Sequence, residues 1–248
     1  GLELTNNDYL AFGPLPHQQA YRDLIEAPDL SDFYGRHGEL STLEDWIVEK
    51  KCKVVALLGI GGIGKTAIAA TLEHRIDQHF KYVIWRSLRE TPPIEKVLSD
   101  CIQLCSEQRD QFVPDSISDS ITKLVQYLEK NRCLLIFDNV ESILEVKKQT
   151  GYHYREGYEI YGHLFQRIGE SKHQSCLVLT SREKPKEIAQ LEGGNRPVRS
   201  LVIQGLQEQY GQKILEAEGL STSDLQWKQV FEHYTGHPFA LKMAAKNI

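Results

Sequence analysis

One stretch of this sequence combines residue types and spacing that suit phosphate chemistry. Gly59–Thr66 reads GIGGIGKT and matches the pattern G-x-x-x-x-G-K-[ST], with a predicted strand before it and a predicted helix after it. Glycines allow positive φ angles and a close backbone approach, so that successive N–H groups point into one anion-sized concavity. The helix that begins near Lys65 adds the positive end of its dipole. We expect Lys65 to reach the β- and γ-phosphates of a nucleotide and the Thr66 hydroxyl to ligate Mg²⁺.

Six residues of this stretch and the next residue form the expected nucleotide site, namely Gly61, Gly62, Ile63, Gly64, Lys65, Thr66 and Ala67. The alternative is a glycine-rich turn followed by an ordinary surface lysine. That alternative does not explain why four glycines stand between a good strand and a good helix.

Two further polar residues follow apolar runs. Asp138 ends the run LLIFD, at the carboxyl end of a predicted strand where ligands of α/β sheets gather, and is the second expected Mg²⁺ ligand. The alternative for Asp138 is an aspartate in an ordinary turn. Arg182 follows LTS at the end of another run and is expected to sense the γ-phosphate or to hold its developing charge, the alternative being a surface arginine. We therefore assign the catalytic roles to Lys65, Asp138 and Arg182.

The residues after Asp138 predict slow hydrolysis. Asn139 stands where many hydrolysing P-loop proteins carry the acid that activates water, and an amide cannot accept a proton there. Glu141 is a substitute acid if its side chain turns toward the site. Because Glu141 lies two residues after Asn139, the sequence does not determine whether its side chain points toward the site.

Short apolar runs without polar alternation alternate with segments of helical period. Such runs suit strands covered on both faces, and the alternation predicts a parallel sheet with crossover helices. The expected strands are Val54–Leu58, Tyr82–Trp85, Cys133–Phe137, Cys176–Leu179 and Val198–Ile203. The segments of helical period run from Ile68 to Ile76, Ile94 to Cys105, Ile121 to Leu128 and Tyr158 to Ile168. The fold class is therefore α/β, a P-loop NTPase fold with a five-stranded parallel sheet flanked by helices.

The ends of the chain differ from its middle. Residues 1–31, with Pro14, Pro16 and Pro28, read as an irregular lead-in, residues 32–205 as the nucleotide-binding domain, and residues 206–248 as a small all-helical subdomain. Helices are expected there over Glu208–Ala217, Asp224–Tyr234 and Phe239–Asn247. The tyrosine-rich segment Gly151–Tyr161 reads as a loop whose rings pack onto the domain.

Composition limits the classes of partner. The 248 residues carry a net charge of −5 with a pI near 6.0, which disfavours a surface built for nucleic acid, and no apolar stretch is long enough to span a membrane. The five cysteines are odd in number and scattered, which favours reduced thiols and a cytoplasmic protein. Cys101 and Cys105 have helical spacing, but no accompanying ligand pair predicts a metal site. Because the single methionine is Met243, we expect the chain to be part of a longer protein.

Four motifs in this order resemble the NB-ARC class of STAND NTPases, the nucleotide switch of apoptotic protease-activating factor and of plant disease-resistance proteins. Beside the P-loop and LLIFDN, they are DFYGRHGELSTL at Asp32–Leu43 and TGHPFAL at Thr235–Leu241. The sequence of these segments is most similar to that of bacterial members that often carry C-terminal WD-type propeller repeats, and none of that repeat sequence is present here. The family's winged-helix subdomain, whose histidine binds the β-phosphate of ADP, is also absent.

The resemblance implies further site residues. The backbone near Phe33 and Tyr34 would contact adenine, Arg36 would lie beside the nucleotide, and Pro238 and Leu241 would face it from the helical subdomain. The alternatives are plain packing for Phe33 and Tyr34, a helix-start cation for Arg36 and a first-turn proline for Pro238. His237 is expected to be spacing rather than a ligand. The family also implies that the strand at Cys176–Leu179 lies between the P-loop strand and the strand at Cys133–Phe137.

The expected function is an ATP/ADP switch. Nucleotide between the sheet domain and the helical subdomain would bias their relative position, with slow Mg²⁺-dependent hydrolysis and self-association of the full-length protein. The sequence contains no N-K-x-D segment, the motif that recognises guanine in GTPases, which agrees with selectivity for adenine. The alternatives are a catalytic ATPase or phosphotransferase, and a scaffold that binds nucleotide constitutively.

Overall fold

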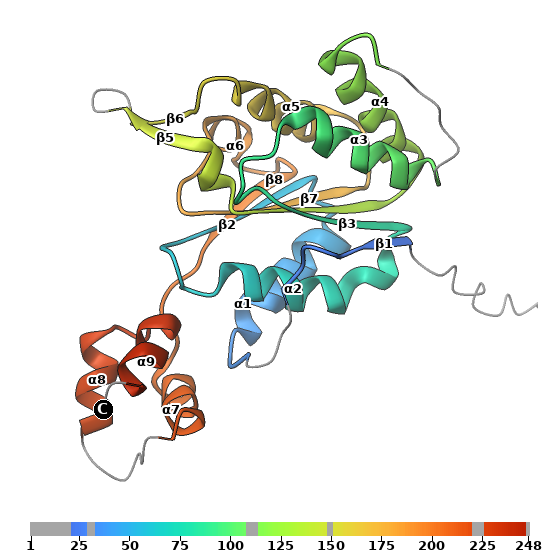
Figure 1. Cartoon of the computed structure of the whole chain (residues 1–248). Helices are drawn as coiled ribbons and strands as arrows, with labels where there is room; N and C mark the ends of the chain where they lie inside the picture. Colours follow the sequence, from blue (N-terminus) through green and yellow to red (C-terminus); the bar gives the residue numbers. More distant parts are fainter. Residues whose placement is uncertain (1–20, 29–32, 108–113, 148–150, 220–225, 247–248) are drawn as a thin grey trace, which may run out of the picture.

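A computed structural model describes residues 21–28, 33–107, 114–147, 151–219 and 226–246 (Figure 1). Six strands form one parallel sheet in the order β1-β3-β4-β7-β2-β8. They are β1 (Tyr21–Asp23), β2 (Val54–Leu58), β3 (Tyr82–Ser87), β4 (Cys133–Asp138), β7 (Cys176–Ser181) and β8 (Val198–Val202). In the centre, Val54 of β2 lies opposite Leu177 of β7 and Val198 of β8. The five expected strands are all present, and β7 lies between β2 and β4 as the resemblance implied.

The sixth strand, β1, lies in the segment that was expected to be an irregular lead-in. It is an edge strand of the sheet and pairs with β3, and the Tyr21 ring stacks on Tyr82 at 5.4 Å between centroids. The Asp23 carboxylate forms an ion pair with Arg86 of β3. Three residues are too few to show a strand period, so only these partners reveal the strand. Pro14, Pro16 and Asp32 lie outside the described residues.

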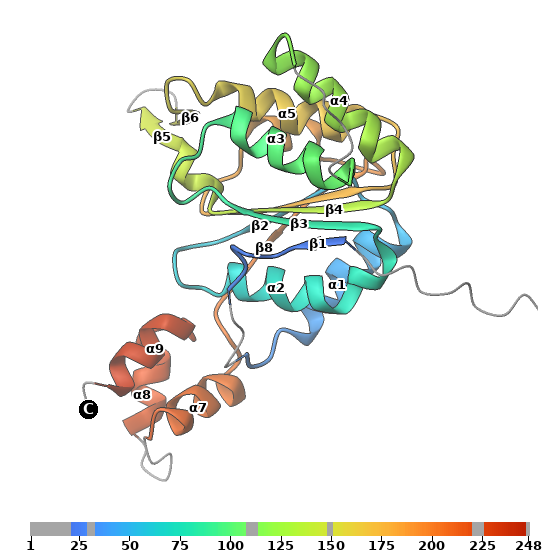
Figure 2. The ribbon, with the colours of Figure 1, turned by 45° about the vertical axis from the view of Figure 1, so that its right-hand side comes forward.

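Helices cover both faces of the sheet (Figures 1 and 2). One face carries α1 (His37–Glu44), the π-helix η1 (Asp45–Glu49), α2 (Lys65–Ile76) and η2 (Asp77–His79), and the other carries α3 (Ile94–Cys105), α4 (Ile117–Lys130), α5 (Glu159–Glu170) and α6 (Lys186–Leu191). Alternate residues of β2 belong to different cores: Val55 and Leu57 pack with α2, whereas Val54 and Ala56 pack on the opposite side. This two-sided burial explains why the strands read as continuous apolar runs.

The tyrosine-rich segment is a strand followed by a helix rather than a loop. Beyond the 3₁₀ helix η3 (Val140–Ile143), β5 (Leu144–Lys147) pairs antiparallel with β6 (Gly151–Tyr154), and α5 begins at Glu159. The rings pack on the domain as expected: Tyr158 and Tyr161 donate to the carbonyls of Thr91 and Pro92, and Tyr154 donates to the buried Glu187 at 2.7 Å. The pairing of β5 and β6 connects separate segments, which local pattern did not reveal.

Three helices after β8 form a helical subdomain, set beyond the carboxyl edge of the sheet (Figure 2). They are α7 (Glu208–Ala217), α8 (Gln226–His233) and α9 (Pro238–Ala245), and they share a core of Leu206, Ile214, Leu215, Leu241 and Ala245. The expected helix limits at Asp224 and Asn247 lie outside the described residues. In the described parts of the chain, none of the helices is both long and apolar enough to cross a bilayer.

Candidate functional site

The glycine stretch turns the chain from β2 into α2 and leaves backbone donors free. Gly62 and Gly64 have φ angles of 78° and 104°, and Gly64 caps α2. Within the described residues, no acceptor is found for the N–H groups of Gly61, Gly62 and Gly64. Free N–H groups at the start of a helix form an anion-binding concavity. The loop therefore has the geometry of a phosphate site.

Lys65 is a buried cation whose ammonium binds backbone carbonyls of the P-loop. Its ammonium donates to the carbonyls of Gly59 at 2.8 Å and Ile60 at 3.1 Å, and no ion pair with a described carboxylate accompanies these bonds. Burial lowers the pKa of Lys65, and the nearby carboxylate of Glu141 opposes that shift. A bound phosphate would supply the negative charge that this ammonium lacks.

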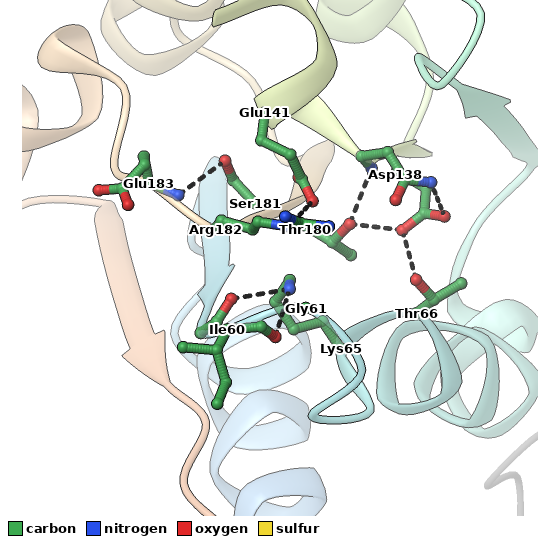
Figure 3. A network of polar contacts seen from close by, with 12 residues as sticks. Ile60, Gly61, Lys65, Thr66, Asp138, Glu141, Thr180, Ser181, Arg182 and Glu183 are labelled. Carbon is green, nitrogen blue, oxygen red and sulfur yellow. Dashed lines mark hydrogen bonds and ion pairs between the residues drawn. The ribbon is translucent and has the colours of Figure 1, made fainter. Parts of the chain in front are cut away.

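Thr66 and Asp138 meet across the site, as Figure 3 shows. The Thr66 hydroxyl donates to Asp138 Oδ1 at 2.8 Å, and the Thr180 hydroxyl donates to the same oxygen. The Asp138 side chain ends β4 at 4% exposure, where Asn139 Nδ2 donates to its second oxygen at 2.7 Å. A hydroxyl and a carboxylate are hard oxygen donors, so this pair fits Mg²⁺. Elsewhere in the described residues, no cluster of three or more His, Cys, Asp or Glu side chains could hold a metal ion.

Asn139 turns the chain so that Glu141 faces the site. Asn139 adopts a left-handed φ of 62°, and its N–H donates to the Thr180 hydroxyl at 2.9 Å. In the short helix η3 that follows, Glu141 Oε1 accepts from Arg182 Nε at 3.1 Å (Figure 3). The other oxygen, Oε2, is buried and has no hydrogen-bond partner among the described residues. The direction of Glu141, open in the sequence, is toward Lys65 and Arg182.

Arg182 lies over the glycine loop at the end of β7. Its side chain is 61% exposed and is held by Glu141. A Cβ atom on Gly61 would come within 2.9 Å of the Arg182 guanidinium, so the arginine and the loop backbone are neighbours. The structure thus brings Lys65, Thr66, Asp138 and Arg182 to one edge of the sheet.

Arg36 joins the segment before α1 to the P-loop. Its side chain is 4% exposed, donates to the carbonyl of Ile63 at 3.1 Å, and pairs with Glu39 at 2.8 Å. Phe33 packs on the core beneath the sheet, whereas Tyr34 packs on the core of the helical subdomain. Phe33, Tyr34 and Arg36 therefore lie where the two parts of the molecule meet.

The helical subdomain reaches the P-loop through the turn before α9. Pro238 is the first residue of α9, and the preceding residue His237 contacts the Gly61 carbonyl through Nε2 at 2.8 Å. The sequence assigned His237 no contact with the site. The one signal for such a role was its position just before a first-turn proline, which is a helix N-cap position. Leu241 is fully buried in the helical core, so its side chain offers no surface to a nucleotide.

Comparison with known proteins agrees with this geometry. Residues 36–156 match the NB-ARC domain family. An uncharacterised WD repeat-containing protein of Nostoc sp. is 43% identical over 243 residues, which cover 94% of this chain and 19% of that protein. Disease resistance RPP13-like protein 4 of Arabidopsis thaliana is 27% identical over 117 residues, 45% of this chain and 13% of that protein. The chain spans about a fifth or less of the length of these relatives.

The fold is shared with a solved structure. A STAND (signal transduction ATPase with numerous domains) protein with a tetratricopeptide repeat sensor from Pyrococcus horikoshii has a TM-score of 0.60 at 17% identity. The match covers 87% of this chain and 30% of that protein. These findings confirm the resemblance to NB-ARC proteins, including bacterial ones with WD repeats.

Proposed function

Because residues 36–156 of this chain belong to the NB-ARC family of nucleotide-binding modules, we propose that it is the ATP/ADP switch of a longer signalling protein. Nucleotide and Mg²⁺ would bind between the sheet domain and the helical subdomain. Whether ATP or ADP is bound would bias the position of the subdomain relative to the sheet domain. One observation carries the proposal: free N–H groups, an unpaired buried ammonium and a hydroxyl–carboxylate pair converge at the carboxyl edge of the sheet.

Each residue has a distinct role in this proposal. The P-loop N–H groups and Lys65 would bind the phosphates, Thr66 and Asp138 would hold the metal ion, and Arg182 would respond to the γ-phosphate. Bound Mg²⁺ would neutralise phosphate charge. The segment at Phe33 and Tyr34 would contact adenine, with Arg36 and Pro238 beside the nucleotide. These assignments are supported by the position of each residue around the loop.

Hydrolysis should be slow. Asn139 uses its amide to bind Asp138 and cannot accept a proton from water. Glu141 is the acid that faces the site, and we assign it the role of proton acceptor. Its Oε1 atom accepts a hydrogen bond from Arg182 Nε at 3.1 Å, which occupies one oxygen of this carboxylate. Turnover at tens per second, within the range of about 1–10³ s⁻¹ typical of enzymes, would contradict a switch.

Two other functions remain distinguishable by experiment. A phosphotransferase would turn over faster when candidate acceptors are added, whereas a switch would not. A constitutive scaffold would keep the same hydrodynamic size when ADP is exchanged for a slowly hydrolysed ATP analogue in the full-length protein. The switch predicts a change in size through self-association, and it is proposed to act in the cytoplasm without nucleic acid or membrane.

The deciding experiment identifies the nucleotide. The purified chain is denatured and the released nucleotide is separated by chromatography, and the same chain after nucleotide removal is titrated with MgADP, MgATP and MgGTP by calorimetry. We expect ADP in the released fraction and binding of both adenine nucleotides but not of GTP. No heat with millimolar ADP or ATP would overturn the proposal.

A further inference from the structure

His237 touches both parts of the molecule. Its Nε2 atom lies 2.8 Å from the carbonyl oxygen of Gly61 in the P-loop, 176 positions away in the sequence. Its Nδ1 atom accepts from the N–H of Ala240 at 3.2 Å and so caps α9. One side chain therefore connects the first turn of a helix in the small subdomain to the phosphate-binding loop.

These two contacts fix the proton on the imidazole ring. An N–H donor faces Nδ1, so that nitrogen must be the acceptor, and a carbonyl faces Nε2, so that nitrogen must carry the proton. Only the neutral Nε2–H tautomer satisfies both contacts. The ring thus acts as an acceptor for the helix and as a donor for the loop.

The contact with Gly61 also constrains the next N–H group. The carbonyl of Gly61 and the N–H of Gly62 belong to one planar trans peptide group and point in opposite directions. Holding the carbonyl toward the helical subdomain therefore turns the Gly62 N–H away from it, to the other side of the loop. Since glycine on both sides allows this peptide group to rotate, the loop itself does not fix that direction.

The turn that carries His237 is itself anchored beside the loop. The N–H of Leu206 donates to the carbonyl of Gly236 at 2.8 Å, which ties the chain leaving β8 to the turn before α9. A Cβ atom on Gly62 would lie 2.9 Å from both His237 Cε1 and Phe239 Cβ, so no further side chain fits between the turn and the loop.

We infer that His237 is a positioning residue: when the helical subdomain is docked, it orients the Gly61–Gly62 peptide group so that the Gly62 N–H faces the phosphate. The inference deepens the proposed nucleotide function and rests on it. Docking of the subdomain and binding of phosphate then strengthen each other, because a coupling between two binding events is reciprocal.

Two substitutions separate the two contacts of the ring. His237→Asn keeps an acceptor suited to capping α9, but its shorter side chain does not reach Gly61. His237→Gln places an amide N–H near the position of Nε2 and loses the capping acceptor. His233→Asn on α8, an exposed histidine that packs on Tyr234, is the matched control. Each full chain is compared by MgADP calorimetry, thermal melting and the amide resonance of Gly62 in nucleotide-free protein.

We expect His237→Asn to weaken MgADP binding about three- to tenfold, the worth of one hydrogen bond, and to shift the Gly62 resonance while melting as the unaltered chain does. His237→Gln should retain the affinity and the resonance but destabilise α9, and His233→Asn should change neither property. Unaltered affinity in His237→Asn, with or without a shifted resonance, would overturn the inference and leave the proposed function intact. If the unaltered chain itself binds no adenine nucleotide, the proposed function fails instead.

Discussion

The sheet domain and the helical subdomain differ most in the size of their cores. Among the described residues, the two faces of the sheet bury thirty and twenty core residues, whereas the helical subdomain buries five. Because hydrophobic stabilisation grows with the apolar area removed from water, the sheet domain is the more stable of the two. Lys65, Thr66 and Asp138 lie on the stable part, whereas His237 and Pro238 lie on the other.

This difference separates the two tasks that a switch needs. Lys65 and Thr66 at the start of α2 and Asp138 at the end of β4 are held by the sheet domain, whereas the direction of the Gly62 N–H is proposed to depend on His237 of the helical subdomain. A described hydrogen bond joins the subdomain to the P-loop, from His237 to the Gly61 carbonyl, and in the proposed function a nucleotide would shift the subdomain by binding its two positions with different affinity.

Core truncation should have the largest effect and tests the comparison directly. Leu57→Ala in β2 and Leu215→Ala in α7 each remove a fully buried leucine and should each cost about 2–5 kcal/mol. The loss in β2 should lower the stability of the whole chain, whereas the loss in α7 should unfold the helical subdomain alone. Hydrogen exchange will distinguish them: the β2 and β4 amides should stay protected in Leu215→Ala. Equal loss of protection in the sheet would show that the two parts are one cooperative unit.

Glu141→Gln should affect the chemistry without affecting the fold. If Glu141 accepts the proton from water, removing its basicity should slow single-turnover hydrolysis about a hundredfold, at the low end of general-base effects. The pKa of Lys65 should fall further, since the charge of Glu141 contributes most to raising it. MgADP affinity, measured in parallel, should be retained. An unaltered hydrolysis rate with normal binding would assign the base elsewhere.

Lys65→Ala should weaken nucleotide binding and slightly stabilise the apo protein. Loss of a charged hydrogen bond to phosphate costs about 1.5–3 kcal/mol, roughly ten- to a hundredfold in affinity. Burial lowers the pKa of Lys65, so the folded state disfavours the charged form at neutral pH, and the variant avoids that cost. Calorimetry and thermal melting measure both effects, with the exposed Lys186→Ala as control. A lower melting temperature in Lys65→Ala would contradict this account.

The sequence predicted the features that depend on local patterns. It did not predict those that depend on contacts between residues far apart in the chain. The strands at Val54–Leu58 and Cys133–Asp138 were predictable because burial on both faces leaves a local apolar run. The P-loop was predictable because one turn needs its glycines in fixed places. The β1 strand and the contact of His237 with Gly61 depend on partners far along the chain. The direction of Glu141 depends on one left-handed residue, Asn139, a backbone choice that a side-chain pattern does not encode.

The smallest predicted effect concerns pH and lies in the sheet domain, at His173 before β7. Burial lowers the pKa of this imidazole and Lys53 lowers it further, against the opposing carbonyls of Ile168 and Ser175. Because its folded pKa lies below the unfolded value of about 6.5, stability is complete above pH 6.5 and declines as the pH falls from there toward the folded pKa. His173→Gln should flatten the decline in melting temperature below about pH 6.5, and amide exchange should locate the change in β7 rather than in α7–α9. An unchanged pH slope in that variant would assign the acid sensitivity to other groups.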